Sequence, residues 1–389
     1  MGNLEKIGQL EEQLRIHGID SLLVLSREDS DSVLPLLLPV HVVAQTAIWF
    51  RADGAHVVLT GSTDANMYRE FGIFEIIVCK DDFQTELARL FERLDPKSLA
   101  LNISETDHLV DGLTVGQYQL LEDAVGADRL SRLERSSEPM VSHIRSIKTD
   151  YELQCIRTAV EKTCAIYDEV VDNIAVGMSE TEIGDLFVEG MRRHHVVNAF
   201  GSPYSYPLVC IVRCGLAHRE PNPNNVLKPN DILVCDFSVS HKGYCSDIAR
   251  SFYVLGSGDG EVPHDVARAF ETTVQAVSAV IDGIQVNMTG CEVDALGRVI
   301  IEEAGYPTIR HSVGHQLGMR VHDGGLVLGP ASHPSSSGKV QVGQVFAIEP
   351  TVIQDDQLPS FIVEEDIVVH EGSVEILSRR QQSLYLIRS

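Results

Sequence analysis

An acidic residue, Asp236, stands inside residues 232–239, an apolar run that is otherwise typical of a buried β-strand. Burying an unpaired carboxylate is costly, so this side chain needs a cation or a proton nearby. A reversal between His241 and Lys242 would place Asp247, on the returning strand, directly opposite Asp236. Their Cβ atoms would then lie about 5 Å apart. Two carboxylates this close repel each other unless they share a proton or a metal ion.

A second segment of the chain repeats this arrangement. Glu349 interrupts the apolar run 345–352, and a reversal centred on Gln357 would place it opposite Glu365. Two such hairpins would supply four carboxylates to one site, and oxygen-rich ligation favours divalent ions such as Mn²⁺. An alternative for the first pair is that one acid pairs with Arg250 while the other caps a turn.

Three histidines lie between the two hairpins, at positions 311, 315 and 322. A lone histidine is usually structural. Three within twelve residues, in a chain that also carries four matched acids, favour a functional role, because neutral imidazole is a common metal ligand and proton carrier. His218, in the loop before the first acidic hairpin, is a further candidate.

The sequence pattern predicts two domains, an N-terminal one over residues 1–140 and a C-terminal one over residues 141–389, since 389 residues exceed the usual size of one compact domain. In the first, short apolar strands alternate with helices, which indicates an α/β unit with a mixed sheet. In the second, amphipathic helices surround strand-like runs, which predicts an α+β domain. Capping boxes open three of these helices at Thr149, Ser179 and Thr289, and Pro263 marks the first turn of a fourth.

Charge and composition limit the expected partners. The formal net charge of −25 repels phosphate backbones and anionic membranes, so neither nucleic acid nor a membrane is expected as a partner. The N-terminus lacks the basic start and apolar run of a signal peptide, which favours a cytoplasmic protein. The eight cysteines form no CxxC pair, and free thiols are favoured over a redox or metal pair at Cys210 and Cys214.

These residues together resemble a known family, the pita-bread metallopeptidases, which include methionine aminopeptidase, Xaa-Pro aminopeptidase, Xaa-Pro dipeptidase (prolidase) and creatinase. The resemblance covers residues 140–389 strongly, and the N-terminal domain by size and layout. It implies a C-terminal pita-bread domain, a smaller creatinase-like N-terminal domain and a homodimer. The candidate ligands that match in order are Asp236, Asp247, His315, Glu349 and Glu365.

The resemblance implies two divalent ions, with Mn²⁺ expected first and Co²⁺, Zn²⁺ or Fe²⁺ as alternatives. Asp236 and Asp247 would bind one ion. Asp247, His315 and Glu349 would reach the second in varying combination. Glu365 would bridge the pair.

The same resemblance implies peptide-bond hydrolysis. A hydroxide that bridges two divalent ions is a competent nucleophile, because the ions lower the pKa of bound water. Glu349 is the expected general base. His218 would assist the leaving group or hold the substrate. His311 and His322 would be the substrate-side and proton-shuttling histidines.

The expected protein is therefore a dinuclear-metal-dependent exopeptidase that releases the N-terminal residue from a short peptide or a small amide. The alternatives are a non-peptidase small-molecule hydrolase or lyase on the same fold, ectoine hydrolase-like or creatinase-like, and a catalytically inactive binding module. The intact ligand set counts against the inactive module and against metal-free creatinase chemistry. A high-salt cytoplasm would suit the acidic, lysine-poor composition and make ectoine plausible, although ordinary compositional drift explains the composition as well.

Two positions depart from the family pattern. Gln316 places an amide where the family commonly has no side chain, which is expected to narrow the pocket. The family's peptidases carry an arginine two residues before the bridging glutamate, and Val363 occupies that position when Glu365 is the bridge. The absence of the arginine weakens the case for recognition of a substrate carboxylate, for which Arg320 is a replacement candidate.

Overall fold

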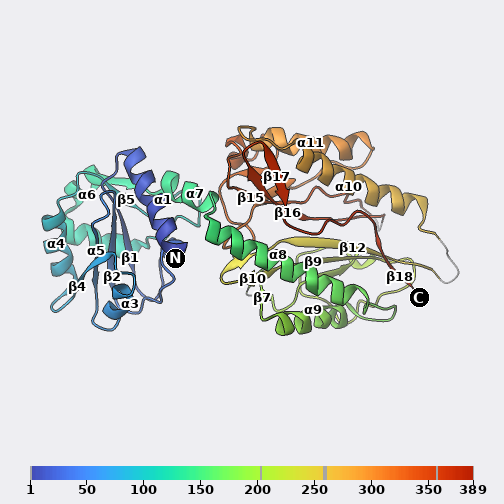
Figure 1. Ribbon diagram of the computed structural model, residues 1–389, viewed down its shortest axis with the longest axis horizontal. Coiled ribbons are helices and arrows are strands. Elements are labelled where there is room, and N and C mark those ends of the chain that lie inside the picture. The colour runs from blue at the N-terminus through green and yellow to red at the C-terminus, as the bar shows by residue number, and fades with distance from the viewer. Residues whose placement is uncertain (1, 202–203, 257–260, 356–357, 389) are drawn as a thin grey trace. The chain divides into compact units, whose positions relative to one another are not determined.

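The computed structural model describes residues 2–201, 204–256, 261–355 and 358–388 (Figure 1). The chain divides into two compact units, Met1–Arg145 and Ser146–Ser389. Within the described ranges, none of the helices combines the length and apolar character needed to cross a membrane.

The apolar runs of the first unit pair into one six-stranded mixed sheet in the order β4-β3-β2-β1-β5-β6. β1 is antiparallel to β2 and parallel to β5, as the mixed sheet expected from the sequence requires. The strands are β1 (Ser21–Ser26), β2 (Thr46–Arg51), β3 (His56–Thr60), β4 (Phe74–Val78), β5 (Leu99–Leu101) and β6 (Glu134–Ser136). The helices are α1 (Gly2–His17), α2 (Leu34–Leu37), α3 (Ala65–Arg69), α4 (Phe83–Leu94), α5 (Val115–Val125), α6 (Ala127–Leu133) and α7 (Glu138–Ser146).

Four long helices organise the second unit, and three begin at the expected capping boxes. Thr149, Ser179 and Thr289 each accept a hydrogen bond from the backbone N–H three residues later, and a glutamate there bonds back to the cap. Local sequence therefore determines where these helices begin. The helices are α8 (Asp150–Val171), α9 (Glu180–His194), α10 (His264–Gly283) and α11 (Gly290–Glu303).

The second unit contains two main sheets. A four-stranded sheet has the order β18-β12-β9-β8, and a five-stranded antiparallel sheet has the order β14-β13-β15-β16-β17. The first comprises β8 (Leu208–Ile211), β9 (Ile232–Phe237), β12 (Ile248–Val254) and β18 (Tyr385–Ile387), and β7 (Val197–Asn198), β10 (Val239–His241) and β11 (Tyr244–Cys245) form a small sheet beside it. The second comprises β13 (Gly314–Gln316), β14 (Val327–Leu328), β15 (Val345–Ile348), β16 (Glu365–His370) and β17 (Ser373–Ile376). Short 3-10 helices cover Val212–Cys214 and Pro334–Ser337.

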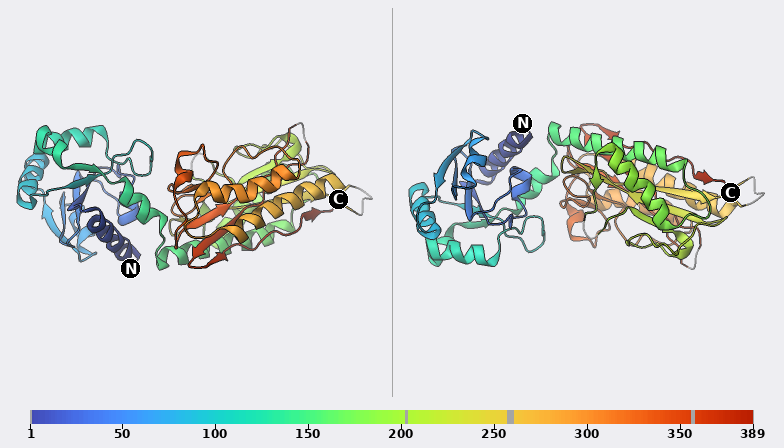
Figure 2. Two further views of the ribbon diagram at one scale, coloured as in Figure 1. Left: turned by 90° about the horizontal axis from the view of Figure 1, so that it is seen from above. Right: turned by 90° about the horizontal axis from the view of Figure 1, so that it is seen from below.

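The four long helices pack on these sheets as two pairs, α8 with α9 and α10 with α11 (Figures 1 and 2). Tyr167 of α8 and Phe187 of α9 pack against Phe237 of β9, with the rings of the two phenylalanines 4.6 Å apart. Phe270 of α10 packs against Phe361 at 5.6 Å in a second core.

Candidate metal centre

The first acid-bearing hairpin turns one residue later than expected. A two-residue turn at Lys242 and Gly243 joins β10 to β11, and both residues have positive φ, 52° and 83°, as a type I′ turn requires. Asp236 consequently pairs with Ala249 instead of Asp247, so the predicted direct opposition is wrong. The offset is two residues, and because side chains alternate with period two, both acids remain on one face.

The second hairpin differs from the expected register by one residue, and the consequence is larger. Ile348 pairs with Glu365, so Glu349 comes level with Glu364. The predicted pairing of Glu349 with Glu365 is therefore wrong. A one-residue shift turns Glu365 to the other face of the strand and brings Glu364 to the face of Glu349. The expected reversal at Gln357 lies outside the described residues.

Acids from both hairpins converge with a histidine. Ligand atoms of Asp247, His315 and Glu364 all lie within 4.8 Å of one another. Nε2 of His315, on β13, lies 3.5 Å from Oδ2 of Asp247 and 3.6 Å from Oε1 of Glu349. His315 on β13 is therefore joined in one cluster by the residues directly before β12, directly after β15 and directly before β16.

The electrostatics of this cluster fit a cation. Burial raises the pKa values of Asp236, Glu349 and Glu364 well above their ordinary range, and the nearby charge of Asp247 raises them further. Burial raises the pKa of Asp247 itself to about 6. Oδ1 of Asp236 is buried and receives no hydrogen bond from the described part of the chain. Mutually repelling oxygen ligands of this kind are what a divalent ion neutralises.

His315 is in the form that binds a metal. Its Nδ1 donates to the carbonyl of Gln316 at 3.3 Å, which leaves the Nε2 lone pair directed at the acids. Burial lowers the pKa of the ring to about 4, so His315 is uncharged at neutral pH. Neutral imidazole is the form in which histidine ligates metals.

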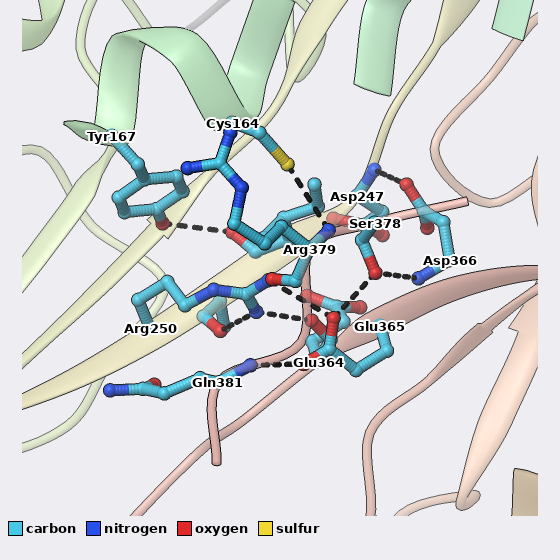
Figure 3. A network of polar contacts seen from close by, with 12 residues as sticks. Cys164, Tyr167, Asp247, Arg250, Glu364, Glu365, Asp366, Ser378, Arg379 and Gln381 are labelled. Atoms are coloured by element: carbon cyan, nitrogen blue, oxygen red, sulfur yellow. Dashed lines mark hydrogen bonds and ion pairs between the residues drawn. The ribbon is translucent and has the colours of Figure 1, made fainter. Parts of the chain in front are cut away.

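Glu365 instead takes part in a buried network of polar contacts behind the cluster, shown in Figure 3. Its Oε2 lies 3.0 Å from Nη2 of Arg250, and its Oε1 accepts a hydrogen bond from the backbone N–H of Gln381 at 2.8 Å. The Ser378 hydroxyl donates to the same carboxylate. Arg250 also donates to the carbonyl of Glu364 at 2.7 Å. Glu365 thus holds the arginine that fixes the backbone of Glu364.

Sequence reasoning missed Glu364 and two residues that hold Asp247. The Ser238 hydroxyl donates to Oδ1 of Asp247 at 2.8 Å, and Asp366 accepts the backbone N–H of Asp247 at 3.0 Å. Asp366 is two residues beyond Glu364 and so shares its strand face. The acidic run 364–366 was visible in the sequence, but the choice among its members depends on register.

The histidines outside the ligand set are placed differently from one another. The ring of His322 lies 4.4 Å from that of His315, centroid to centroid, and His322 is exposed. His218 is also exposed and lines a cavity together with Asp236. Both side chains can therefore reach a molecule that approaches the acids from solvent.

His311 is half-buried and its ring is held by protein groups. Nδ1 donates to the carbonyl of Ser312 at 2.7 Å, so Nε2 accepts from the Thr351 hydroxyl at 2.9 Å in the neutral ring. Burial lowers the pKa of His311, which keeps the ring neutral.

A cavity of about 150 Å³ adjoins the acids. A space of this size holds a group as large as benzene. The arginine of the family pattern stands two residues before the bridging glutamate. If Glu364 takes the place of Glu365, the corresponding position is Ile362 instead of Val363, and Ile362 lines this cavity. Its aliphatic wall is formed by Leu208, Leu216, Val234, Ile353 and Ile362, with His218 and Asp236 as polar members.

Gln316 follows His315 on β13, so the two side chains point to opposite faces of the strand. The Gln316 amide is buried beside Gly325, where a Cβ added to the glycine would come within 2.6 Å of Nε2. Gln316 is not among the residues that line the 150 Å³ cavity in the described parts of the chain.

Two sheets that helices cover, carrying a buried cluster of acids with one neutral histidine, define a metal-binding hydrolase of the pita-bread class. The chain belongs to metallopeptidase family M24: the model of that family matches residues 154–371, more than half of the sequence. The resemblance read from the sequence is thereby confirmed. As a member of this family, the chain is a metallopeptidase.

Individual relatives agree with this assignment. The uncharacterized peptidase YqhT of Bacillus subtilis is 25% identical over 71% of this chain and 73% of its own length. An Xaa-Pro dipeptidase of Lactobacillus delbrueckii subsp. lactis is 27% identical over 62% of each chain, less than two thirds of that relative. The structure of an Xaa-Pro dipeptidase from Bacillus anthracis has a TM-score of 0.79 at 23% identity and covers 99% of this chain and 100% of that one. This likeness confirms the α+β pita-bread architecture.

Proposed function

We propose that this chain is a dinuclear-metal-dependent exopeptidase that releases the N-terminal residue from short peptides, in the manner of an Xaa-Pro aminopeptidase or dipeptidase. The observation that carries the proposal is the convergence of buried acids from two hairpins on His315. It is supported by the similarity to the Xaa-Pro dipeptidase of Lactobacillus delbrueckii subsp. lactis. An inactive binding module has no evident need for a cluster of mutually repelling carboxylates.

Five side chains would hold the two ions, with Glu364 in the role that the sequence assigned to Glu365. Bound divalent ions supply an activated water and polarise the scissile carbonyl. Mn²⁺ is the proposed metal, because four of the five donors are carboxylates. The five are Asp236, Asp247, His315, Glu349 and Glu364.

The remaining steps fall to side chains at the edge of the cluster. Glu349 accepts the proton of the attacking water, since its side chain is 23% exposed while its carboxylate lies beside His315. His322 donates a hydrogen bond to the oxyanion that develops on the carbonyl. His218, at the cavity, hands a proton to the leaving amine. His311 contacts the substrate once it exchanges its bond to Thr351.

The cavity supports an apolar residue next to the scissile bond. The side chains that the structure places around it include aliphatic groups and no lysine or arginine. A proline ring or an aliphatic side chain fits both the size and the chemistry of this space, whereas a free carboxylate would find no cationic partner among these lining residues.

We also propose that the enzyme acts in the cytoplasm as a homodimer. The location is supported by the eight cysteines, all of which are free thiols, and the assembly by resemblance to the family. Sedimentation velocity at micromolar concentration tests the assembly: a species of one chain, 42.8 kDa, would contradict it.

Metal analysis followed by turnover tests the function. The purified protein is assayed with Mn²⁺ or Co²⁺ on Xaa-Pro dipeptides, longer Xaa-Pro peptides, proline-free peptides and ectoine. We expect about two ions per chain, cleavage of the peptides, and loss of both in Asp236→Asn. Asp231→Asn is the matched control, because Asp231 is a buried acid directly before β9, beyond the end of the strand opposite to Asp236, and pairs with Arg213.

Two results would contradict the proposal. Bound metal with opening of the ectoine ring and no peptide cleavage would replace the exopeptidase by a small-molecule hydrolase. Equal metal content in Asp236→Asn and wild type would exclude the metal site as described.

A further inference from the structure

The three histidines that contact the substrate in the proposed function, His218, His311 and His322, all lie outside helices and strands. A side chain on an irregular segment samples many positions, whereas proton transfer and oxyanion binding require a fixed geometry. Each of these segments is tied to the helical framework by an ion pair whose acid is buried. The three ion pairs involve different helices and are considered in turn.

Glu180, the first residue of α9, is fully buried and holds the segment that carries His218. Its carboxylate oxygens lie 2.7 and 3.0 Å from the two terminal nitrogens of Arg219, the residue after His218. Further donors to the same carboxylate are Asn222 N, Asn225 Nδ2 and Ile211 N, at 2.9, 3.0 and 2.9 Å. Because Ile211 lies on β8, which pairs with β9, Glu180 connects His218 to the strand of Asp236.

Asp294 and Arg298, one turn apart on α11, hold the segment of His311. The guanidinium Nε and Nη2 lie 2.6 and 2.8 Å from the two oxygens of Asp294. Nη2 of Arg298 also donates to the carbonyl of His311 at 3.0 Å. Asp294 accepts the backbone N–H of Val313 at 3.3 Å, two residues beyond the histidine.

Lys148, just before α8, holds the segment of His322. Its Nζ lies 3.0 Å from Oδ2 of Asp323, the residue after His322, and the two side chains are 1% and 2% exposed. Asp323 accepts the backbone N–H of Arg320 at 3.3 Å and donates its own N–H to the carbonyl of Gln316 at 2.9 Å. The segment is thus joined both to α8 and to the strand of His315.

We propose that these three ion pairs are positioning devices, each of which fixes the backbone of one substrate-contacting histidine. Glu180 acts on His218, the Asp294–Arg298 pair on His311, and the Lys148–Asp323 pair on His322. The assignment rests on the proposed function for what the histidines do, and on the contacts alone for how they are held. None of the positioning residues contacts the substrate.

The Glu180 pair offers the sharpest test. Apart from the bond from Ile211, the four hydrogen bonds to the Glu180 carboxylate all come from residues within eight positions of His218. Glu180→Gln is expected to lower kcat by about 10- to 100-fold, with a smaller change in KM and unchanged metal content. In a His218→Ala background, the same substitution is expected to change kcat less than about twofold, because the positioned group is gone. Additive losses in the double variant would overturn the proposal.

Two further variants separate positioning from folding. Arg219→Lys keeps the charge but loses the two-pronged contact, so it should fold and still lower kcat. Asp231→Asn removes a buried acid that also contacts an arginine through two nitrogens, at 2.7 and 2.9 Å, and that adjoins none of the three histidines. The kcat values of Asp231→Asn and Glu180→Gln are compared under conditions in which the two variants have lost the same amount of thermal stability. An equal fall in kcat for both variants would overturn the proposal.

A readout that needs no turnover completes the test. In ¹⁵N-histidine-labelled protein, the His218 ring is expected to give one sharp set of resonances in the wild type and broadened or multiple sets in Glu180→Gln. His56, buried in the first unit, serves as the internal reference. Unchanged His218 resonances would refute the positioning role. Absence of peptide cleavage by the wild type would instead refute the proposed function and leave this measurement valid.

Discussion

The adjacent acids Glu364 and Glu365 are predicted to respond in opposite ways to the same isosteric change. The register of β15 and β16 turns Glu364 toward His315 and Glu365 toward Arg250. Glu364→Gln should therefore remove metal binding while the fold persists. Glu365→Gln should destabilise the fold while metal binding persists.

The cost of Glu365→Gln follows from burial. Arg250 and Glu365 are 3% and 0% exposed, so the neutral variant leaves a positive charge buried without its counter-charge. Removing one partner of a buried ion pair costs about 3–5 kcal/mol. The amide oxygen still accepts one hydrogen bond, so we expect the lower end, about 3 kcal/mol. For a unit of about 150–250 residues this lowers Tm by about 6–12 °C.

The expected effect of Glu364→Gln on the metal-free protein has the opposite sign. Burial and the charge of Asp247 raise the pKa of Glu364, so a neutral amide relieves repulsion and the free energy of unfolding should stay equal or rise. Loss of a group that only orients a metal ligand lowers metal affinity by about 10- to 100-fold. Glu364→Gln removes a proposed ligand itself, so the affinity should fall by more than this.

Calorimetric titration with Mn²⁺ and chemical denaturation of the metal-free proteins measure both quantities for both variants. Glu365→Gln is the control for Glu364→Gln, because the two changes have the same chemistry one residue apart. If Glu365→Gln abolished metal binding and Glu364→Gln retained it, the register argument would be refuted and the original ligand set restored.

Three further outcomes are expected. The folded pKa of Asp247, about 6, lies above its ordinary 3.8, so the stability that this group contributes is complete below about pH 4 and is lost as pH rises through about 6. Metal-free protein should therefore become less stable over this window, and Mn²⁺ should stabilise it more at pH 7 than at pH 5 in thermal scans. Ile362→Arg, which puts a cation into the apolar cavity, should lower kcat/KM for peptides with an aliphatic residue there by about 10-fold or more while metal content stays constant; unchanged kinetics would place the substrate elsewhere. Burial likewise raises the pKa of Asp31 in the first unit to about 6, so Asp31→Asn should become more stable relative to wild type between pH 4 and pH 8, and a pH-independent difference in Tm would contradict this.

The sequence by itself determined the local elements and the kind of site. Capping boxes at Thr149, Ser179 and Thr289 begin helices because the cap and its glutamate lie three residues apart, within reach of one another in any context. Asp236 and Glu349 could be singled out for a similar reason. A carboxylate in an apolar strand requires a cation wherever the strand is packed.

The register of the two hairpins was decided by the tertiary structure. β16 is buried on both faces over nearly its whole length, so the acids 364–366 are followed by apolar residues on both faces and no alternation marks the functional side. An error of two residues at Asp236 kept both acids of the first hairpin on one face, whereas an error of one residue at Glu365 turned its side chain away from the cluster and brought that of Glu364 to it.

The ion pairs behind the histidines could not be read from the chain either. Glu180 and Arg219 are 39 residues apart, and Lys148 and Asp323 are 175 residues apart. No spacing rule connects such residues, because their encounter depends on how helices pack on sheets. The sequence therefore indicated a cluster of acids and histidines suited to binding a metal, and only the packing decided which acid faces the cluster and what holds the histidines in place.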